Sequence, residues 1–454
     1  MINTIILGHA LNILPKLPAE SVNCVVTSPP FWGLRDYGIE PVTWDGDKDC
    51  RHKWGNKSIT LKHKPGETNP GKESWFKDSG ASDDKGNCFC LKCGAWRGSL
   101  GLEPTFELYI KHLCDIFDEV KRVLKKDGTC WVNLGDSYNG SKVGNTNAST
   151  GAIGKPKYSG NFTKTFKKEN QSNIPTKSLC LIPQRFVIEM VNRGWILRNT
   201  IIWHKPNCMP SSAKDRFTVD FEYVYFFVKS KKYWFEQQFD KAEYLEVWSR
   251  KGSGPNTPYE QNNPRKRWGL TKHEIATKRK GSYVDPLHKK PIYPQGKNKR
   301  AVWTIPTQPF PEAHFAVYPE TLIEPMIKAG CPRYVCKKCG KARVKVLDKT
   351  FIPRPTNDKP ENYRAIQEEK KGNRKLAIVA RKGVGHNEYK FKGYTDCGCN
   401  AGWESGVVLD PFMGAGTTAL VALKQRKRFI GIEIKQEYID MSYKRIARVQ
   451  QRIF

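Results

Sequence analysis

One segment near the C-terminus constrains the fold more than any other part of the sequence. The buried-strand pattern of Val407 to Leu409 runs into Asp410-Pro-Phe-Met-Gly-Ala-Gly-Thr-Thr418, and a helix pattern covers Thr417 to Lys424. A second strand pattern, Arg428 to Ile432, follows and ends at Glu433. Strand, glycine turn, helix and strand together predict half of a Rossmann-like α/β sheet.

The glycine turn and the acid that follows it predict a nucleoside site. Gly414 and Gly416 let the backbone turn tightly and approach a ligand. Glu433 lies nineteen residues after Gly414, where a Rossmann-like half binds ribose hydroxyls. Thr417 and Thr418 crowd the helix start, where a pyrophosphate would need open backbone amides, so a nucleoside with an amino-acid tail fits better. The predicted cofactor-binding residues are Asp410, Pro411, Phe412, Gly414, Gly416, Thr417, Thr418 and Glu433.

A second motif stands near the N-terminus, at the end of the buried-strand pattern Val22 to Val26. Thr27 is followed there by Ser28-Pro29-Pro30-Phe31. The two prolines fix the backbone and remove its N–H groups, which leaves a rigid row of acceptors. Acceptors that hold the hydrogens of an aromatic amine make its nitrogen lone pair available, and an aromatic ring can stack on an extruded base. Ser28, Pro29, Pro30 and Phe31 are therefore the predicted catalytic residues.

The rest of the chain alternates helix and strand patterns with polar insertions. The helix patterns cover Pro104–Leu124, Ile182–Asn192 and Pro319–Ala329, and further strand patterns cover Ile2–Leu7, Thr129–Leu134, Ile196–Trp203 and Tyr223–Val228. The alternation predicts an α/β core assembled from separated pieces of the chain. We divide the sequence into residues 1–40, 41–99, 100–235 (with a mobile basic loop at 139–175), 236–300, 301–330, 331–406 and 407–454.

The charge of the chain predicts a polyanionic partner. The formal net charge is +32, from 77 Lys and Arg against 45 Asp and Glu. The excess is concentrated in particular segments, and residues 246–300 combine it with Trp248, Tyr259 and Trp268. Basic residues release counterions from phosphates, and aromatic rings stack on bases, so nucleic acid is the expected partner.

Cysteine pairs predict two metal clips. The chain has 14 cysteines, and it carries neither a signal-peptide pattern nor an apolar run long enough to cross a membrane, so we expect a cytosolic protein without disulfides or a membrane partner. Two groups of residues have the spacing of structural zinc ligands. The first group is Cys336, Cys339, Cys397 and Cys399, and the second is Cys50, His52, Cys90 and Cys93. Free thiols are the alternative for both groups.

Taken together, the two motifs resemble those of the amino-methylating DNA methyltransferases. Asp410–Thr418 resembles the cofactor motif of that family, and Thr27–Phe31 resembles its catalytic motif. The catalytic motif comes first in the chain, as in the permuted beta group. Arg198–Asn207 and His314–Glu320 also resemble family elements, whereas Gly8-His9 stands where many relatives have Gly-Asp.

The resemblance implies a class I S-adenosylmethionine-dependent methyltransferase with a seven-stranded sheet. It also implies that residues 236–300 recognise the target sequence in double-stranded DNA, with zinc-ribbon-like insertions beside the core. Within the family, Ser-Pro-Pro usually accompanies methylation of cytosine N4 and Asp-Pro-Pro that of adenine N6, so Ser28 favours cytosine. Adenine-N6 methylation, RNA methylation and non-catalytic nucleic-acid binding remain the alternatives. A cognate restriction endonuclease is an expected partner of such a prokaryotic or phage enzyme.

Overall fold

The computed structural model describes residues 2–55, 58–59, 78–81, 88–140, 174–240, 297–308, 317–353 and 385–453. The chain divides into two compact units, one of residues 1–236, 301–342 and 399–454 and the other of residues 237–300 and 343–398. Most of the basic loop 139–175, most of the basic region 236–300 and the start of the His314–Glu320 element lie outside the described residues.

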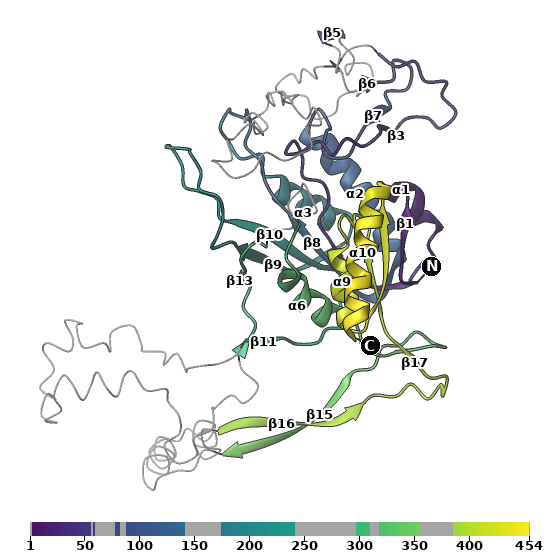
Figure 1. Cartoon of the computed structure of the whole chain (residues 1–454), viewed down its shortest axis with the longest axis vertical. Helices are drawn as coiled ribbons and strands as arrows, with labels where there is room; N and C mark the ends of the chain where they lie inside the picture. The colour runs from purple at the N-terminus through teal and green to yellow at the C-terminus, as the bar shows by residue number, and fades with distance from the viewer. Residues whose placement is uncertain are drawn as a thin grey trace, which may run out of the picture. The chain divides into compact units, whose positions relative to one another are not determined.

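The first unit is built on one eight-stranded sheet (Figure 1). The strand order is β1-β19-β18-β2-β8-β10-β9-β13. The first five strands of that order, β1, β19, β18, β2 and β8, run parallel to one another. Strand β10 is antiparallel to both of its neighbours, and β13 is parallel to β9. The strands are β1 (Thr4–Leu7), β2 (Val22–Thr27), β8 (Leu124–Leu134), β9 (Ile196–His204), β10 (Phe221–Val228), β13 (Val302–Thr304), β18 (Val407–Asp410) and β19 (Arg428–Glu433).

The sheet has the expected Rossmann-like α/β layout, with one strand more than the seven that the resemblance implies. The added strand is β13, which pairs Trp303 with Trp203 beyond the edge of β9. Only Trp303 of its three residues is buried. Three residues are too few for an alternation of buried and exposed side chains to be recognised in the sequence.

Helices cover both faces of the sheet and give three layers. One face packs against α1 (Ala10–Ile13), the 3₁₀ turn η1 (Leu14–Lys16), α2 (Phe106–Val123) and α3 (Ile182–Asn192). The other face packs against α6 (Glu320–Gly330), α9 (Thr417–Lys424) and α10 (Gln436–Ile453). Neighbouring residues of β2 serve opposite layers, since Val25 belongs to the first core and Cys24 and Val26 to the second.

The insertion at residues 41–99 contains small sheets that its sequence pattern does not predict. A three-stranded sheet joins β3 (Val42–Trp44), β7 (Trp96–Gly98) and β6 (Cys88–Phe89), and β4 (Ser58–Ile59) pairs with β5 (Asp78–Ala81). Farther along the chain, β14 (Val335–Cys336) pairs with β17 (Trp403–Glu404). In the second unit, β15 (Lys345–Pro353) and β16 (Gly385–Tyr394) form a hairpin, and β11 (Phe239–Asp240) pairs with β12 (Lys297–Asn298).

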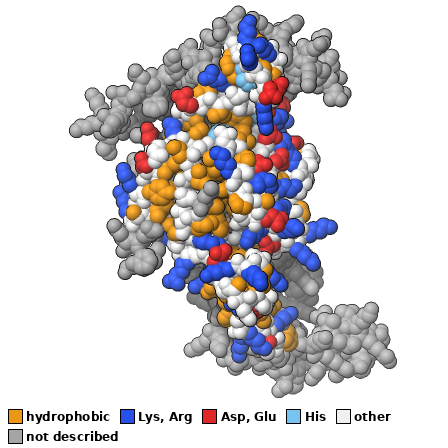
Figure 2. All heavy atoms as spheres, turned by 90° about the vertical axis from the view of Figure 1, so that its right-hand side faces the viewer, with side chains coloured by type: hydrophobic (Ala, Val, Ile, Leu, Met, Phe, Trp, Pro, Cys, Tyr) orange, Lys and Arg blue, Asp and Glu red, His pale blue; other side chains and the backbone are white. Residues whose placement is uncertain are grey.

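Part of the excess of basic residues lies on the surface of the described residues. Figure 2 shows Lys and Arg side chains spread over one face, with Asp and Glu side chains fewer and hydrophobic side chains between them. Among the described residues, no helix is both long and apolar enough to span a lipid bilayer.

Candidate active site

The two sequence motifs meet at the carboxyl ends of neighbouring strands. Strands β2 and β18 are parallel neighbours, with Cys24 opposite Val408 and Val25 opposite Leu409. At their ends, Thr27 Oγ1 donates a hydrogen bond of 2.6 Å to Asp410 Oδ1, although the residues lie 383 positions apart in the chain. Ligands of α/β folds bind at this edge of the sheet, so the motifs form one candidate site.

Asp410 is the buried centre of this junction. Besides Thr27, it accepts hydrogen bonds from Thr418 Oγ1 at 2.7 Å, from the Tyr318 hydroxyl at 3.0 Å and from the Phe412 amide at 3.0 Å. Burial raises the pKa of its carboxyl above the ordinary value, although these donors act in the opposite direction. The carboxylate therefore holds the end of β2, the glycine turn and the start of α9 in one arrangement.

The glycine turn is open on the side where a ligand would approach. Both Gly414 and Gly416 have positive φ angles, of 54° and 78°. A Cβ at Gly414 would meet nothing closer than the Phe412 carbonyl at 4.0 Å, whereas one at Gly416 would lie 2.6 Å from Ser442. The first glycine thus leaves space beside the backbone, and the second allows α10 to pack closely against the turn.

Glu433 is tied to the glycine turn by backbone amides. Its Oε2 accepts from the Gly414 amide at 2.8 Å, and its Oε1 accepts from the amides of Ile434 and Lys435, both at 3.0 Å. Burial raises the pKa of this carboxyl, against the lowering effect of the three amides. The residue stands at the end of β19, next to the turn, where the sequence predicts ribose binding.

The loop Ser28–Phe31, predicted to be catalytic, is fixed on both sides by neighbouring segments. The Tyr109 hydroxyl of α2 donates to the Pro30 carbonyl at 2.7 Å. A Cβ at Gly101 would lie 3.3 Å from Pro30 Cβ, and one at Gly135 would lie 2.6 Å from the Phe31 ring, so both glycines allow close packing of the loop. The Phe31 side chain is half-buried. The loop therefore presents its remaining acceptors in one defined orientation.

The Ser28 hydroxyl has a defined hydrogen-bond direction. Its Oγ donates to Asn133 Oδ1 at 3.1 Å. The Asn133 amide group in turn donates to Glu222 Oε2 at 3.0 Å and to the Tyr223 carbonyl at 3.1 Å, and Glu222 forms an ion pair with Lys205. Because the hydroxyl proton points toward Asn133, the lone pairs of Ser28 Oγ are left to accept from a substrate.

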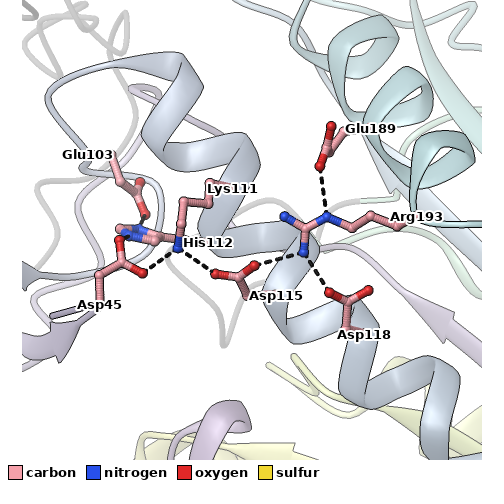
Figure 3. A network of polar contacts seen from close by, with 8 residues as sticks. All are labelled: Asp45, Glu103, Lys111, His112, Asp115, Asp118, Glu189 and Arg193. Carbon is pink, nitrogen blue, oxygen red and sulfur yellow. Dashed lines mark hydrogen bonds and ion pairs between the residues drawn. The ribbon is translucent and has the colours of Figure 1, made fainter. Parts of the chain in front are cut away.

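An ionic network, of which His112 and Glu103 are the buried members, supports the loop from the side of the insertion (Figure 3). His112 Nδ1 bonds to Glu103 Oε1 at 3.1 Å, and His112 Nε2 bonds to Asp45 Oδ2 at 3.0 Å. Lys111 pairs with Asp45 and, at 2.9 Å, with Asp115. Arg193 of α3 continues the network, since it binds Asp115, Asp118 and Glu189.

The network predicts a pH dependence of stability. Burial alone would lower the pKa of His112, but its hydrogen bonds to the Asp45 and Glu103 carboxylates outweigh burial and raise the pKa above its ordinary 6.5. A raised pKa means that the folded state holds the proton more tightly, so this stabilisation is complete below about pH 6.5 and is lost as the pH rises through the raised value. We expect the stability advantage of wild type over His112→Gln to shrink in that direction. Thermal unfolding of both proteins over the pH range measures it, and a constant difference would contradict a charged His112.

Both predicted groups of metal ligands come together. The ligand atoms of Cys50, His52, Cys90 and Cys93 all lie within 4.8 Å of one another, and the same is true of Cys336, Cys339, Cys397 and Cys399. Thiolates and imidazole form a donor set that suits a soft divalent ion.

His9 stands where many family members have an acid, and the structure gives it a local role. Its Nδ1 accepts from the Leu11 amide at 3.3 Å at the start of α1, and its ring packs edge-on against Trp44. Burial lowers the pKa of the imidazole to about 4. His9 is therefore a neutral helix cap.

Sequence reasoning overlooked several residues that complete the site. Asn133 is a polar residue within the apolar strand pattern Thr129–Leu134, and that contrast is a signal that could have identified it. Tyr109 gives no such signal, because an aromatic residue on the apolar stripe of a helix is usually a core residue. Tyr318 falls within a segment that resembles a family element, but only the structure shows its bonds to Asp410 and Thr418.

Comparisons with known proteins show what the chain is similar to. The sequence profile of a DNA methylase family, which includes enzymes acting on N6 and N4 amines, matches residues 22–342 and 401–444. The chain is 25% identical over 443 residues to the type II methyltransferase M.Cfr9I of Citrobacter freundii, which covers 98% of this chain and 87% of that protein. It is 26% identical over 446 residues to M.SmaI of Serratia marcescens, which covers 98% and 90% of the two chains.

Solved structures of DNA methyltransferases match over nearly the whole chain but diverge in detail. The PvuII DNA methyltransferase (cytosine-N4-specific) is 15% identical with a TM-score of 0.41, and the match covers 99% of this chain and 92% of that one. A DNA modification methylase of Thermus thermophilus in complex with S-adenosyl-L-methionine is 16% identical with a TM-score of 0.38, covering 97% and 92%.

Proposed function

Since the chain belongs to the N6/N4 DNA methylase family, we propose that it transfers a methyl group from S-adenosylmethionine to the N4 amine of cytosine in double-stranded DNA. The observation that carries the proposal is the hydrogen bond from Thr27 to Asp410, which joins the loop of predicted amine acceptors to the predicted cofactor turn. Cofactor dependence and DNA as substrate follow from the family. The base and the atom that is methylated are the parts proposed here.

The residues of the glycine turn fit the proposed cofactor. Gly414 leaves room beside the backbone, and Glu433 is bonded to its amide at the end of β19, so a nucleoside and its ribose would lie beside both residues. Asp410 is occupied by four donors within the protein, and we therefore assign it the task of shaping the turn. The bound cofactor supplies the electrophilic methyl group.

The catalytic loop supplies the acceptors for the amine hydrogens. Ser28 Oγ keeps its lone pairs free because its proton is held by Asn133. The Pro30 carbonyl already accepts from Tyr109, so we assign the second amine hydrogen to the Pro29 carbonyl. With both hydrogens held, the nitrogen lone pair would be directed at the methyl group that the cofactor supplies. The methyl–sulfur bond would break as the methyl–nitrogen bond forms, and the amine would release one of its held hydrogens to solvent as a proton. Phe31 provides the stacking surface for the base that leaves the helix.

Ser28 supports cytosine as the target, since the family usually pairs Ser-Pro-Pro with cytosine N4. Adenine N6 is the second candidate, because its amine has the same chemistry and the same acceptors would hold it. Transfer of a labelled methyl group into DNA and into RNA, followed by nucleoside analysis, tests the proposal. N4-methylcytosine in DNA is the expected product. N6-methyladenine would overturn the choice of base, and label in RNA alone would overturn the substrate.

We propose that the basic region at residues 236–300 recognises the DNA target. Its charge and aromatic content support this, and most of it lies outside the described residues. Replacing Arg265, Lys266 and Arg267 by Ala should make the decline of DNA affinity with rising salt less steep. Each phosphate contact contributes a slope of roughly 0.9 in a plot of log affinity against log salt, so up to three contacts would be lost. Fluorescence anisotropy with non-cognate duplex at several salt concentrations measures the slope, and an unaltered slope would remove this cluster from the DNA interface.

A type II restriction system supplies the expected biological setting. The similar proteins M.Cfr9I and M.SmaI are type II methyltransferases, and we propose a cognate restriction endonuclease as the partner of this chain. The corresponding location is the cytoplasm of a prokaryotic or phage-infected cell, where the DNA substrate lies.

A further inference from the structure

The cluster of Cys50, His52, Cys90 and Cys93 has the dimensions of a tetrahedral metal site. Cys50 Sγ lies 4.0 Å from Cys90 Sγ, and Cys93 Sγ lies 3.4 Å from His52 Nδ1. Zinc bonds of about 2.3 Å to sulfur and about 2.0 Å to nitrogen place tetrahedral ligands roughly 3.5–3.8 Å apart. A disulfide needs its sulfurs at about 2.05 Å, so the observed spacing does not correspond to one.

The backbone contacts around the cluster also suit a metal site. The Lys92 amide donates to Cys90 Sγ at 3.4 Å, which stabilises negative charge on the sulfur. The Gly94 amide closes the turn on the Cys90 carbonyl at 3.0 Å, with a Gly94 φ of 74°. A Cβ at Gly46 would lie 2.9 Å from Cys93 Sγ, so this thiol packs directly on a glycine backbone.

We propose that these four residues bind one zinc ion, and that the ion anchors the insertion that positions the catalytic loop. Three thiolates and one imidazole make up a common structural zinc site with no open position for catalysis. The anchoring role rests on the proposed function, whereas the binding of zinc does not.

The first step from the zinc cluster to the loop runs through two tryptophans. The turn that carries Cys90 and Cys93 lies between β6 and β7, and β7 begins with Trp96, which pairs with Trp44 of β3. Both rings lie nearly parallel to the buried ring of His112, with centroid distances of 4.5 Å for Trp44 and 5.4 Å for Trp96. The small sheet that the ion would hold together therefore encloses His112.

The second step runs from His112 to the loop itself. His112 binds Glu103, as Figure 3 shows, and Glu103 Oε2 accepts from the Gly101 amide at 2.8 Å. The Glu103 carbonyl accepts from Trp32 Nε1 at 2.9 Å, and Trp32 directly follows Phe31. Gly101 also packs against Pro30 and receives the Gly33 amide on its carbonyl at 2.8 Å. A continuous series of contacts thus connects the zinc cluster, through His112 and Glu103, with Pro30 and with the residue that follows Phe31.

The experiment compares wild type with Cys90→Ser/Cys93→Ser, and uses Cys208→Ser as the matched control. Cys208 belongs to neither cluster. Zinc is counted by mass spectrometry, unfolding is followed by heat, and methyl transfer is measured in single turnovers at saturating cofactor and DNA. We expect the double variant to lose one zinc per chain relative to wild type, to unfold at a lower temperature and to transfer methyl groups at least about tenfold more slowly. Misplacement of reacting groups by about 1 Å can cost on the order of 100-fold. Calorimetric affinity for S-adenosylmethionine should stay within about twofold, because the glycine turn lies on other strands.

Each result bears on one part of the proposal. An unchanged zinc count in the double variant, or wild type without zinc, would overturn the metal site. The group of Cys336, Cys339, Cys397 and Cys399 could also hold zinc, through four sulfur donors, so the difference in zinc count between the proteins is the informative quantity. Loss of zinc with wild-type transfer rates would overturn the anchoring role and leave the metal site standing.

A conservative variant guards against a folding defect in the double variant. Cys93→His keeps a zinc ligand and should restore the zinc count and most of the transfer rate, and its failure to restore the rate while holding zinc would also contradict the anchoring role. Cobalt loaded in place of zinc should show the visible absorption of tetrahedral thiolate coordination in wild type and in Cys208→Ser. Absence of N4-methylcytosine in the wild-type reaction would count against the proposed function alone.

Discussion

Replacing Ser28 by Ala should slow methyl transfer by about two orders of magnitude and leave cofactor affinity almost unchanged. The substitution removes one acceptor of the amine hydrogens, and loss of a single preorganised transition-state contact costs roughly 3 kcal/mol. The hydroxyl that is removed donates to Asn133 of β8, whereas the glycine turn follows β18, so the cofactor site should persist. Single-turnover assays at saturating cofactor and DNA isolate the chemical step.

Two variants make this result specific. Ser21→Ala removes a hydroxyl that bonds to the Pro18 carbonyl in a turn before β2, and its transfer rate should match wild type. Phe31→Ala should weaken DNA binding by about 1–3 kcal/mol, the usual range for one stacked base, with a smaller effect on the rate at saturation. A Ser28→Ala protein as fast as wild type would refute the acceptor mechanism and remove the support for cytosine.

Replacing Gly414 by Val should abolish measurable binding of S-adenosylmethionine. Gly414 has a φ of 54°, and a side chain there would project into space that the protein leaves open. Overlap with a ligand costs about 3 kcal/mol or more, which corresponds to a loss of affinity of at least about 100-fold. Because no protein atom is displaced, the cost to folding should be limited to about 1–2 kcal/mol of backbone strain. Isothermal calorimetry and thermal unfolding measure the two effects separately.

Variants at two other glycines distinguish the effect of overlap with the ligand from the effect of backbone strain. Gly402 also has a positive φ, 73°, with only the Lys337 side chain nearby at 3.9 Å, so Gly402→Val should show the strain without loss of cofactor binding. Gly416→Ala would press on Ser442 at 2.6 Å and should destabilise the fold itself. Unchanged affinity in Gly414→Val would exclude the glycine turn as the cofactor site.

The sequence was sufficient for the core, because its strongest patterns are local. The helix patterns of Ile182–Asn192 and Thr417–Lys424 coincide with α3 and α9, and the strand patterns at 22–26 and 407–409 fall within β2 and β18. The two motifs carry their own chemistry in consecutive residues, so they could be recognised before the fold was known. The DNA methylase family predicted from them is confirmed.

Residues that act across the fold could not be predicted in the same way. Asn133 orients Ser28 from a position 105 residues away, and His112 bonds to Asp45, which lies 67 positions away in the chain. Short strands such as β6 and β7 have too few residues for a period of two to be visible. The specific catalytic, cofactor and zinc assignments stay predictions, which the variants above test.

The bond between Thr27 and Asp410 also bears on when this protein can first become active during its own synthesis. The two residues are 383 positions apart, and ribosomes add roughly 5–20 residues per second, so about 20–80 s pass between them. Throughout that interval β2 has been made but the parallel neighbour that completes its edge has not. A nascent chain can therefore carry the loop proposed to be catalytic and still lack the glycine turn proposed to bind the methyl donor. Contacts of such long range are also slow to form after release, because the entropy of closing a long loop is lost before any bond between its ends can form. The two parts of the proposed site can therefore act together only after β18 has paired with β2.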